Sequence, residues 1–387
     1  MSLPAVRLLQ RHIAAQGWDL TRKRSLFKPF LNRQGPILPY EIELQLGDRC
    51  DLACTHCEGK HSPIIARDYV PEAIMLTQSM GGRVPLFILS GFNTDPTRNP
   101  KLIDVIEAVE QSGSAVGLHT HGTSLLELEA SQDFLSRFLF AVAVKTRRGR
   151  PKELQIARDY VSVSLDAGYP KSYREIKGKD CFESVVFALQ EICRMRKEIS
   201  NCNLAVRVTY LLHPQNSSLA EIETVVNLMK TIKPDSLRFS VPYLYFGAGG
   251  NECRRYRDQH EIPFYKRIRP ILERFERQRT NRLPVIFALP PKRFQNIDRW
   301  KFHQCANGYY MGFCVGTDGY AYRCSSSVYS PAHRLGPLTF DPDDIYLMIL
   351  RNQQPDFDPT VSCFPLKVRC TRPAGAINNA YILGRGI

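Results

Sequence analysis

The sequence of 387 residues lacks any run of about 18 or more apolar residues, the length that a membrane-spanning helix needs. Its first part, Met1 to Arg33, has scattered charges and lacks a compact apolar stretch before a small-residue cleavage site, so no secretory signal is expected. Both absences predict a cytoplasmic protein without membrane contact, in a reducing compartment where disulfides are rare. The length allows one large α/β domain or two smaller ones.

Acidic residues are comparatively few, and the formal net charge is +14. Such a balance can indicate nucleic-acid binding. The basic residues are spread along the chain, however, apart from the short runs at 22–24 and 145–152. This distribution favours an anionic small substrate or a solvated surface over RNA or an acidic peptide.

Cysteine, in contrast, is plentiful, and eight of the 12 cysteines fall into two groups that suit metal ligation. Cys50, Cys54 and Cys57 form a C-x3-C-x2-C triplet directly after the apolar stretch Tyr40 to Leu46. Three thiolates on one short loop can ligate three irons of a 4Fe–4S cube and leave the fourth iron open. The alternative is a structural zinc site with His56 or a distant cysteine as fourth ligand, although zinc loops more often use C-x2-C pairs.

The strand followed by this triplet resembles the radical S-adenosylmethionine (SAM) superfamily. The resemblance implies that the amino and carboxylate groups of SAM bind the open iron. One electron, delivered by an external donor of the flavodoxin or ferredoxin type, would then cleave SAM into methionine and a 5′-deoxyadenosyl radical. That radical would abstract a hydrogen atom from the substrate, so the resemblance predicts an enzyme.

Apolar runs alternate with helical patterns along the chain, as a parallel sheet with crossover helices requires. Six such units with right-handed crossovers predict an α/β fold, a partial (β/α)6 TIM-like barrel. The stretch from Leu125 to Asp159 is longer than one connecting helix needs, so we expect an exposed insertion without assigning its structure. The expected strands are 40–46, 84–89, 115–118, 160–165, 205–212 and 237–241, and the expected helices are 71–80, 99–112, 182–199 and 219–232.

Ligands of parallel α/β sheets bind at the carboxyl ends of the strands, so SAM contacts are expected there. Ser90-Gly91-Phe92-Asn93 follows the second strand, where the family usually has a Gly-Gly-Glu-like turn whose acid holds the SAM amino group. Gly91 allows close backbone approach. Asn93 or Asp95 could replace the missing acid.

Further candidates follow the later strands. Ser164-Leu165-Asp166-Ala167 resembles the family's Ser-Leu-Asp-Gly stretch, which makes Ser164 a candidate SAM contact and Asp166 a SAM or substrate contact. Arg174 follows at a position suited to the SAM carboxylate, and Asn216 follows the fifth strand. His119 and His121 replace the family's usual Thr-Asn-Gly, where a histidine could face the substrate or pack against the barrel mouth.

The second group of cysteines begins at Cys305. Cys305, Gly319 and Cys324 match the pattern C-x(9–15)-G-x4-C, with 13 residues before the glycine. This pattern resembles the opening of the SPASM and twitch auxiliary-cluster domains of radical SAM enzymes. The full SPASM continuation, C-x2-C-x5-C-x3-C, is absent, which favours the shorter twitch form.

The resemblance implies one auxiliary 4Fe–4S cluster held by Cys305, Cys324, Cys363 and Cys370, with Cys314 as a spare or alternative ligand. The same four residues could instead bind zinc. Thr317 to Tyr320 predicts a tight hairpin turn between the short strands 309–314 and 320–324. We therefore expect three parts: a basic extension (1–36), a radical SAM partial barrel (37–283) and a twitch-like α+β auxiliary-cluster domain (284–387).

The leading functional hypothesis is hydrogen abstraction from a small polar metabolite, leading to oxidation or epimerisation, with natural-product biosynthesis as one setting. Epimerisation needs a hydrogen-donating thiol, and Cys314 is the first candidate because it lies nearest to the auxiliary ligands in sequence. One alternative is a maturase of ribosomally made peptides. A second alternative, from a different class, is a non-enzymatic metal-binding protein that binds RNA.

Overall fold

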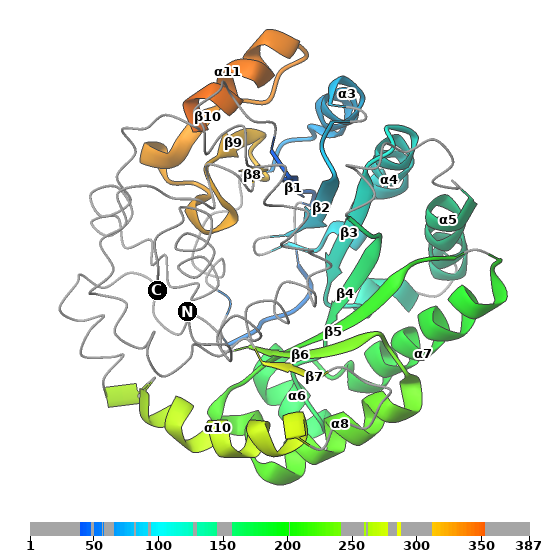
Figure 1. Cartoon of the computed structure of the whole chain (residues 1–387), viewed down its shortest axis with the longest axis vertical. Helices are drawn as coiled ribbons and strands as arrows, with labels where there is room; N and C mark the ends of the chain where they lie inside the picture. The colour runs from blue at the N-terminus through cyan, green and yellow to red at the C-terminus, as the bar shows by residue number, and fades with distance from the viewer. Residues whose placement is uncertain are drawn as a thin grey trace.

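The computed structural model describes most of the chain between residues 39 and 352, and the following account concerns that part alone. Its strands form one sheet of ten, in the order β10-β9-β8-β1-β2-β3-β4-β5-β6-β7. Figure 1 shows this sheet as an arc with helices along its outer side. The described residues are 39–47, 50–55, 57, 66–80, 83–91, 94–126, 130–144, 157–200, 202–240, 259–260, 262–277, 285–287 and 312–352.

Seven strands lie side by side in the order of the sequence, and each pair of neighbours among them is parallel. A parallel pair needs a crossover connection, which the helical patterns between the apolar runs supply. The expected α/β class with a partial barrel is therefore confirmed. The strands are β1 (Glu41–Gln45), β2 (Leu86–Ser90), β3 (Ala115–Thr120), β4 (Tyr160–Ser164), β5 (Ala205–Leu211), β6 (Ser236–Ser240) and β7 (Val285–Phe287).

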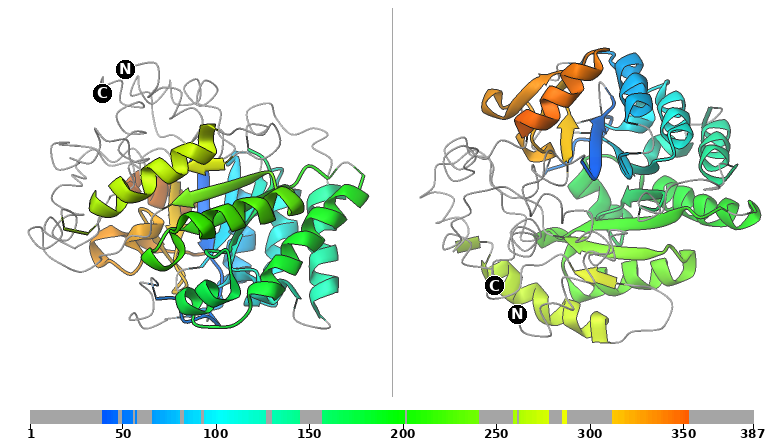
Figure 2. Two further views of the ribbon diagram at one scale, coloured as in Figure 1. Left: turned by 90° about the horizontal axis from the view of Figure 1, so that it is seen from below. Right: turned by 45° about the horizontal axis from the view of Figure 1, so that its top comes forward.

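The helices cover the convex side of the sheet, as two further views make clear (Figure 2). The core fills the layer between sheet and helices, where apolar side chains such as Leu44, Val163 and Ile222 are fully buried. Burial of this kind contributes about 25 cal/mol for each Å² of apolar surface removed from water. The helices are α3 (Val70–Ser79), α4 (Leu102–Gln111), α5 (Ala130–Val144), α6 (Pro170–Lys177), α7 (Phe182–Glu198), α8 (Leu219–Ile232) and α10 (Ile262–Arg277).

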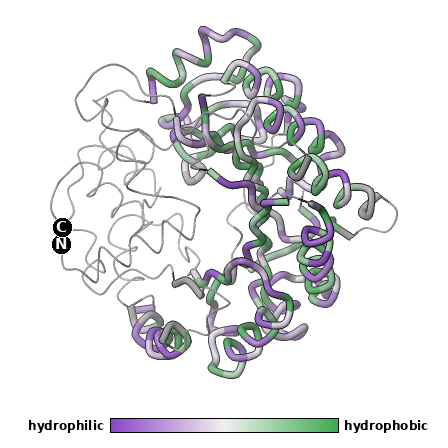
Figure 3. Tube along the Cα trace, turned by 45° about the vertical axis from the view of Figure 1, so that its right-hand side comes forward, coloured by the Kyte–Doolittle hydropathy of each residue, from purple (hydrophilic) through white to green (hydrophobic). Residues whose placement is uncertain are grey.

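The strands are apolar on the helix side and carry polar residues on the concave side. Figure 3 shows the hydrophobic residues following the strands through the middle of the molecule. In β1, Ile42 and Leu44 belong to the core, whereas Glu41 and Glu43 beside them are only half-buried. Because side chains alternate across a strand, Glu41 and Glu43 lie on the face opposite to the helices.

The C-terminal described segment continues the sheet beyond β1. Strand β8 (Gly312–Val315) pairs with β1 in parallel and with β9 (Tyr320–Tyr322) in antiparallel orientation. The expected hairpin around Thr317 is thus confirmed. Strand β10 (Arg334–Pro337) then pairs with β9, and α11 (Pro342–Asn352) follows it.

Six of the described helices and strands were not expected from the sequence: α5 within the long stretch 125–159, the short helix α6, the three-residue strand β7, and α10, β10 and α11. Strand β7 extends the parallel sheet at one edge while β8 extends it at the other. The division of the chain at residue 284 remains a prediction, and the basic extension 1–36 lies outside the described residues. Within the described part, no helix combines the length and the apolar character needed to cross a membrane.

Candidate functional site

The cysteine triplet lies on the loop that leaves the carboxyl end of β1. Cys50, Cys54 and Cys57 are all half-buried. The Cys57 amide donates to the Cys54 carbonyl over 3.2 Å, which closes a turn between two of the thiols. Burial, with smaller contributions from the neighbouring thiols of Cys50 and Cys57, raises the pKa of Cys54 to about 11 against the lowering effect of Lys177.

These thiols fit a bound metal cluster. The three cysteines lie on one loop within a stretch of eight residues. Metal ligation replaces the proton of each thiol, so a half-buried group of three thiols suits a cationic occupant. The donor set of three cysteines on one loop is that of a cluster with one iron left open.

Helix α6 supports this loop through backbone hydrogen bonds. The Ala53 amide donates to the Lys177 carbonyl over 2.9 Å, and the Thr55 amide donates to the Ile176 carbonyl over 2.9 Å. Both carbonyls belong to the last turn of the helix, where they have no partner within the helix itself. Gly178 ends α6 with φ +73°, and a Cβ there would lie 2.8 Å from the Cβ of Ala53. The glycine therefore permits the close approach of loop and helix.

Asp51, next to Cys50, joins the cysteine loop to the ends of β2 and β3. Its carboxylate lies 3.2 Å from Nε2 of His121, 2.7 Å from Nζ of Lys179 and 3.6 Å from Nη1 of Arg98. Hydrogen bonds from His121 and Lys179 hold the pKa of Asp51 well below its usual range although burial opposes them. Asp51 is thus a half-buried anchor for the loop.

His121 lies between two carboxylates. Its Nε2 is also 3.1 Å from Oδ2 of Asp95, and its Nδ1 is 2.9 Å from Oγ1 of Thr123. Burial lowers the pKa of His121, but the carboxylates of Asp95 and Asp51 outweigh that effect and raise it to about 9. The imidazole therefore carries a positive charge at neutral pH in this arrangement.

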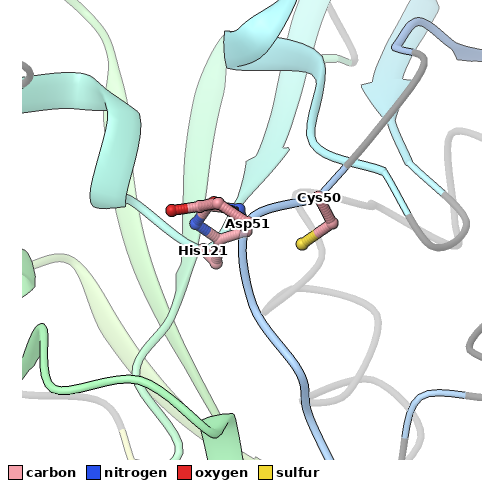
Figure 4. Close-up of side chains that lie close together, drawn as sticks. All are labelled: Cys50, Asp51 and His121. Atoms are coloured by element: carbon pink, nitrogen blue, oxygen red, sulfur yellow. Dashed lines mark ion pairs between the residues drawn. The ribbon is translucent and has the colours of Figure 1, made fainter.

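The Cys50 sulfur completes a compact group, shown in Figure 4. Cys50, Asp51 and His121 each offer a ligand atom, and these atoms lie within 4.8 Å of one another. Such a set could hold a single metal ion, as the zinc alternative requires, but with His121 as ligand. His56, which the sequence suggested for that role, lies outside the described residues.

Asp95, a candidate for the missing acid, is engaged within the protein. Its carboxylate accepts hydrogen bonds from the Thr97 amide (2.9 Å), the Thr120 hydroxyl (2.8 Å) and the His121 amide (2.8 Å). Its contact with the SAM amino group remains a prediction. Asn93, the other candidate, lies outside the described residues.

Ser164, Asp166 and Asn216 are brought together at the ends of β4 and β5, and their contacts are chiefly with one another. The Asp166 carboxylate accepts from the Ser164 hydroxyl and the Leu211 amide, each over 2.6 Å, and forms a buried ion pair with Lys177. The Asn216 amide nitrogen donates to the Asp166 carbonyl over 2.7 Å. Asp166 has φ +54°, a left-handed conformation that these bonds hold in place.

The remaining expected SAM contacts are placed apart from this network. The Ser90 hydroxyl donates to Oε1 of Glu43 over 2.6 Å. Gly91 lies in a turn so tight that a Cβ would lie 2.0 Å from the Thr94 carbonyl oxygen. Arg174 has a side chain 63% exposed, 3.9 Å from Asp180. The roles of these residues toward SAM remain predictions.

A polar cluster lies farther along the sheet. Nε2 of His119 is 2.8 Å from the Tyr160 hydroxyl, and the Arg207 guanidinium lies 3.8 Å above the Tyr160 ring. Gly117 makes room for this ring, because a Cβ there would lie 2.4 Å from Cζ of Tyr160. The sequence indicated His119 alone; the tyrosine and the arginine gave no signal because neither belongs to a recognisable motif.

Of the expected auxiliary ligands, the structure describes Cys324, while Cys305, Cys363 and Cys370 lie outside the described residues. Cys324 follows β9 and begins the short 3-10 helix η10 (Ser325–Ser327), with its Sγ 3.5 Å from the Ser327 hydroxyl. Cys314 is buried in β8, in register with Glu43 of β1. Its role as hydrogen donor remains a prediction.

The fold and the cysteine loop together define a protein with an α/β partial barrel that carries three cysteines on the loop after its first strand. No family model matches the sequence. No curated protein matches it either. The comparison with solved structures, in contrast, gives clear matches.

Streptococcus suis SuiB bound to precursor peptide SuiA matches with a TM-score of 0.53 and 15% identity, over 90% of this chain and 74% of that chain. Native anSMEcpe with bound AdoMet matches with a TM-score of 0.52 and 18% identity, over 84% of this chain and 84% of that chain. Against another SuiB structure the match spans 65% of that protein's chain. At these identities, the likeness establishes the shared fold.

Proposed function

We propose that this chain is a radical SAM enzyme that carries its SAM-binding cluster on Cys50, Cys54 and Cys57. The observation that carries the proposal is the set of three half-buried thiols on the loop after β1, anchored by α6 on one side and by Asp51 on the other. Cys50, Cys54 and Cys57 would hold a 4Fe–4S cluster, which would supply the one-electron reduction needed for the cleavage of SAM.

The chain's own residues would position the reactants. The backbone contacts of Ala53 and Thr55 with α6 hold the thiols at the carboxyl end of the sheet. Ser90, Ser164 and Arg174 are the residues that we propose to contact SAM, on the resemblance of their surroundings to the family. Cys324, with Cys305, Cys363 and Cys370, would hold the auxiliary cluster.

For the substrate, a small polar metabolite that undergoes oxidation or epimerisation is the first candidate. His119, near the carboxyl end of β3, supports a polar substrate, because its imidazole is a polar group at the edge of the sheet where ligands bind. In an oxidation, the cluster that Cys324 and its three partners would hold would supply an electron acceptor.

A peptide is the second candidate, and a specific observation favours it. SuiB, whose fold this chain shares, was solved with its precursor peptide SuiA. The short basic run at 145–152 would suit an acidic peptide. Enzyme action on a peptide and enzyme action on a metabolite both require the same cysteine loop.

Replacing Cys54 tests the proposed chemistry. Cys54→Ala removes one of the three ligands of the cluster. Because the cluster needs all three, we expect the variant to lose at least about 99% of reductive SAM cleavage. The measurement is 5′-deoxyadenosine formation by the anaerobically reconstituted full chain with a chemical reductant. Cys202→Ala is the matched control, because Cys202 is also a half-buried free thiol but packs against the core after α7.

SAM cleavage by the wild-type protein also distinguishes an enzyme from a non-enzymatic RNA-binding protein. If reconstituted wild type forms no 5′-deoxyadenosine while binding RNA tightly, the metal-binding RNA-binding alternative replaces this proposal. If wild type cleaves SAM, capture of a precursor peptide encoded beside this chain would favour the peptide candidate. Failure to bind any such peptide would favour the metabolite.

A further inference from the structure

The imidazole of His121 lies where the cysteine loop meets the carboxyl end of β3. Its Nε2 is 3.2 Å from Oδ1 of Asp51 and 3.1 Å from Oδ2 of Asp95, and its side chain is 8% exposed. Neither contact has the geometry of a hydrogen bond, so this buried nitrogen has no hydrogen-bond partner among the described residues. A buried polar atom of this kind calls for an explanation, and a bound ion is one.

The Cys50 sulfur and the Asp51 carboxylate lie beside this imidazole. One ligand atom from each of Cys50, Asp51 and His121 lies within 4.8 Å of the other two. Figure 4 shows the three side chains, two from the cysteine loop and one from the end of β3. A thiolate, a carboxylate and an imidazole are all zinc ligands in proteins, and three of them with one position left for water make a four-coordinate site.

The spacing of the ring nitrogen and the carboxylate oxygen suits a shared metal ion. Zinc binds nitrogen and oxygen at about 2.0–2.2 Å in tetrahedral geometry, which puts two such ligand atoms about 3.4 Å apart. The distance of 3.2 Å between Nε2 of His121 and Oδ1 of Asp51 is close to that value. The longer zinc–sulfur bond asks the Cys50 sulfur to lie about 3.6 Å from these atoms, which is within the range that the structure shows.

The groups around the imidazole and the carboxylate hold both in place. Nδ1 of His121 is 2.9 Å from the Thr123 hydroxyl, which can accept its proton while Nε2 binds a metal. The Thr123 amide makes a longer contact, 3.3 Å, with the same nitrogen. The hydroxyl donates in turn to Oδ2 of Asp51 over 3.2 Å, and the His121 amide donates to Asp95 over 2.8 Å. The two ligands are therefore oriented by the protein itself.

Lys179 is the cation that competes for the same carboxylate. Its Nζ is 2.7 Å from Oδ2 of Asp51, but its side chain is 45% exposed and can turn into solvent. Arg98 lies farther from Asp51, at 3.6 Å. Buried negative charges in proteins are paired or bind metals, so a divalent ion can take the place of the Lys179 ammonium.

We propose that Cys50, Asp51 and His121 form a binding site for a single divalent metal ion of the zinc type, with water as fourth ligand. Mixed sulfur, nitrogen and oxygen ligands in a four-coordinate arrangement favour this class of ion. The site needs no cluster, so the inference goes beyond the proposed function. Because Cys50 belongs to both sites, an ion held there would exclude a 4Fe–4S cluster from the cysteine loop.

The test uses the full chain with Cys54→Ala and Cys57→Ala, which leaves Cys50 as the one thiol of the triplet. Co²⁺ is the probe, because a thiolate ligand gives it a charge-transfer absorption band. We expect one equivalent of Co²⁺ to bind with such a band, and we expect that band to disappear when Cys50→Ala is added. His121→Gln in the same background should weaken this binding at least about tenfold, since loss of even an outer-shell partner of a metal ligand costs about 10–100-fold.

Two further variants separate a ligand site from a purely structural contact. His119→Gln is the matched control, because His119 lies two residues before His121 with its Nε2 2.8 Å from the Tyr160 hydroxyl; it should bind Co²⁺ as the background does. Lys179→Met removes the competing cation, so Co²⁺ should bind about twofold to fivefold more tightly, the range of an exposed ion pair. Thermal unfolding of the metal-free variants checks that each is folded, and Lys179→Met decides alone if His121→Gln is not.

The outcomes keep this inference apart from the proposed function. Equal Co²⁺ affinity in His121→Gln and His119→Gln would overturn the metal site, as would an unchanged or weaker affinity in Lys179→Met. The background chain lacks two ligands of the proposed cluster, so these results do not depend on SAM cleavage. A wild-type protein that fails to cleave SAM would overturn the proposed function and leave the metal site standing.

Discussion

Asp51 and Asp95 contact the same nitrogen of His121, but their surroundings differ. Asp51, with a side chain 14% exposed, also faces the cationic side chains of Lys179 and Arg98. Asp95, with a side chain 2% exposed, faces hydroxyl and amide donors on η2 (Pro96–Arg98) and β3. Asp51 therefore ties the cysteine loop to its neighbours by charge, whereas Asp95 fixes the strand ends by hydrogen bonds.

Replacing Asp95 should destabilise the protein strongly. Asp95→Ala leaves the Thr97 amide, the Thr120 hydroxyl and the His121 amide without their acceptor. Each unsatisfied buried donor costs about 1–3 kcal/mol, so we expect a loss of about 3–5 kcal/mol in the free energy of unfolding. Urea denaturation of the cluster-free protein at pH 7 measures it.

Asp104→Ala is the control for that measurement, because Asp104 is exposed on the first turn of α4. It should lose no more than about 1 kcal/mol, the value of a charge near a helix N-terminus. Equal losses in the two variants would contradict the assignment of Asp95 as the acceptor that organises the strand ends.

Among the elements, the C-terminal hairpin contains a buried histidine that should respond to pH. His333 ends the short 3-10 helix η11 (Pro331–His333) and is 1% exposed. Burial, with the nearby positive charge of Arg323, lowers the pKa of His333 to about 4. Folding therefore favours the neutral imidazole, which differs from the behaviour of His121.

The sign of the pH effect follows from that lowered pKa. In the unfolded chain a histidine titrates at about 6.5, so this stabilisation is complete above that pH and is lost as the pH falls toward about 4. Between pH 7 and pH 5, we expect His333 to account for a loss of about 2 kcal/mol. The measurement compares unfolding free energies of wild type and His333→Gln at both pH values; parallel losses in the two proteins would refute the prediction.

Elements of the barrel were predictable where an apolar run and a helical pattern alternate. The strand expected at 205–212 is observed at Ala205–Leu211, and the helix expected at 219–232 has those bounds. Helix α6 gave no such signal, because its sequence PKSYREIK is short and largely polar. Its stability comes from tertiary contacts, which a local pattern does not contain.

The residues of the candidate site likewise fall into those that the sequence predicts and those that only the folded structure reveals. The cysteine triplet was recognisable because its three ligands occur within one loop, at a spacing that suits a cluster. Helix α6 lies over a hundred residues away in the chain, and only its docking brings the Ile176 and Lys177 carbonyls to the loop around Cys54. His121 was noted at the end of its strand, but its contact with Asp51 depends on two loops that the sequence does not place relative to each other.

At the scale of the whole molecule, β1 is an interior strand of the sheet. It is flanked by β2 from the barrel and by β8 from the C-terminal segment. The register sets Cys314 opposite Glu43. The hairpin of β8 and β9, which precedes Cys324, therefore lies against β1, which precedes the cysteine loop. Figure 1 shows β8 beside β1, with β9 on the far side of β8. The pairing of β1 with β8 therefore fixes the two ends of the described chain to each other.

Gly312, the first residue of β8, makes that pairing possible. It has φ +146°, and a Cβ at this position would lie 1.5 Å from the Glu41 carbonyl oxygen. The clash is with backbone, so Gly312→Ala should break the β1–β8 pairing and release the segment 312–352 while β2 to β6 remain paired. Hydrogen exchange followed by mass spectrometry should show at least about tenfold faster exchange in 312–352, equivalent to about 1.4 kcal/mol of lost local stability.

Phe340→Ser is the control, because Phe340 lies in the same segment with 60% of its surface exposed. Exchange that accelerates equally throughout the barrel strands would instead mean that the sheet unfolds as one unit, with β8 as an integral strand of it.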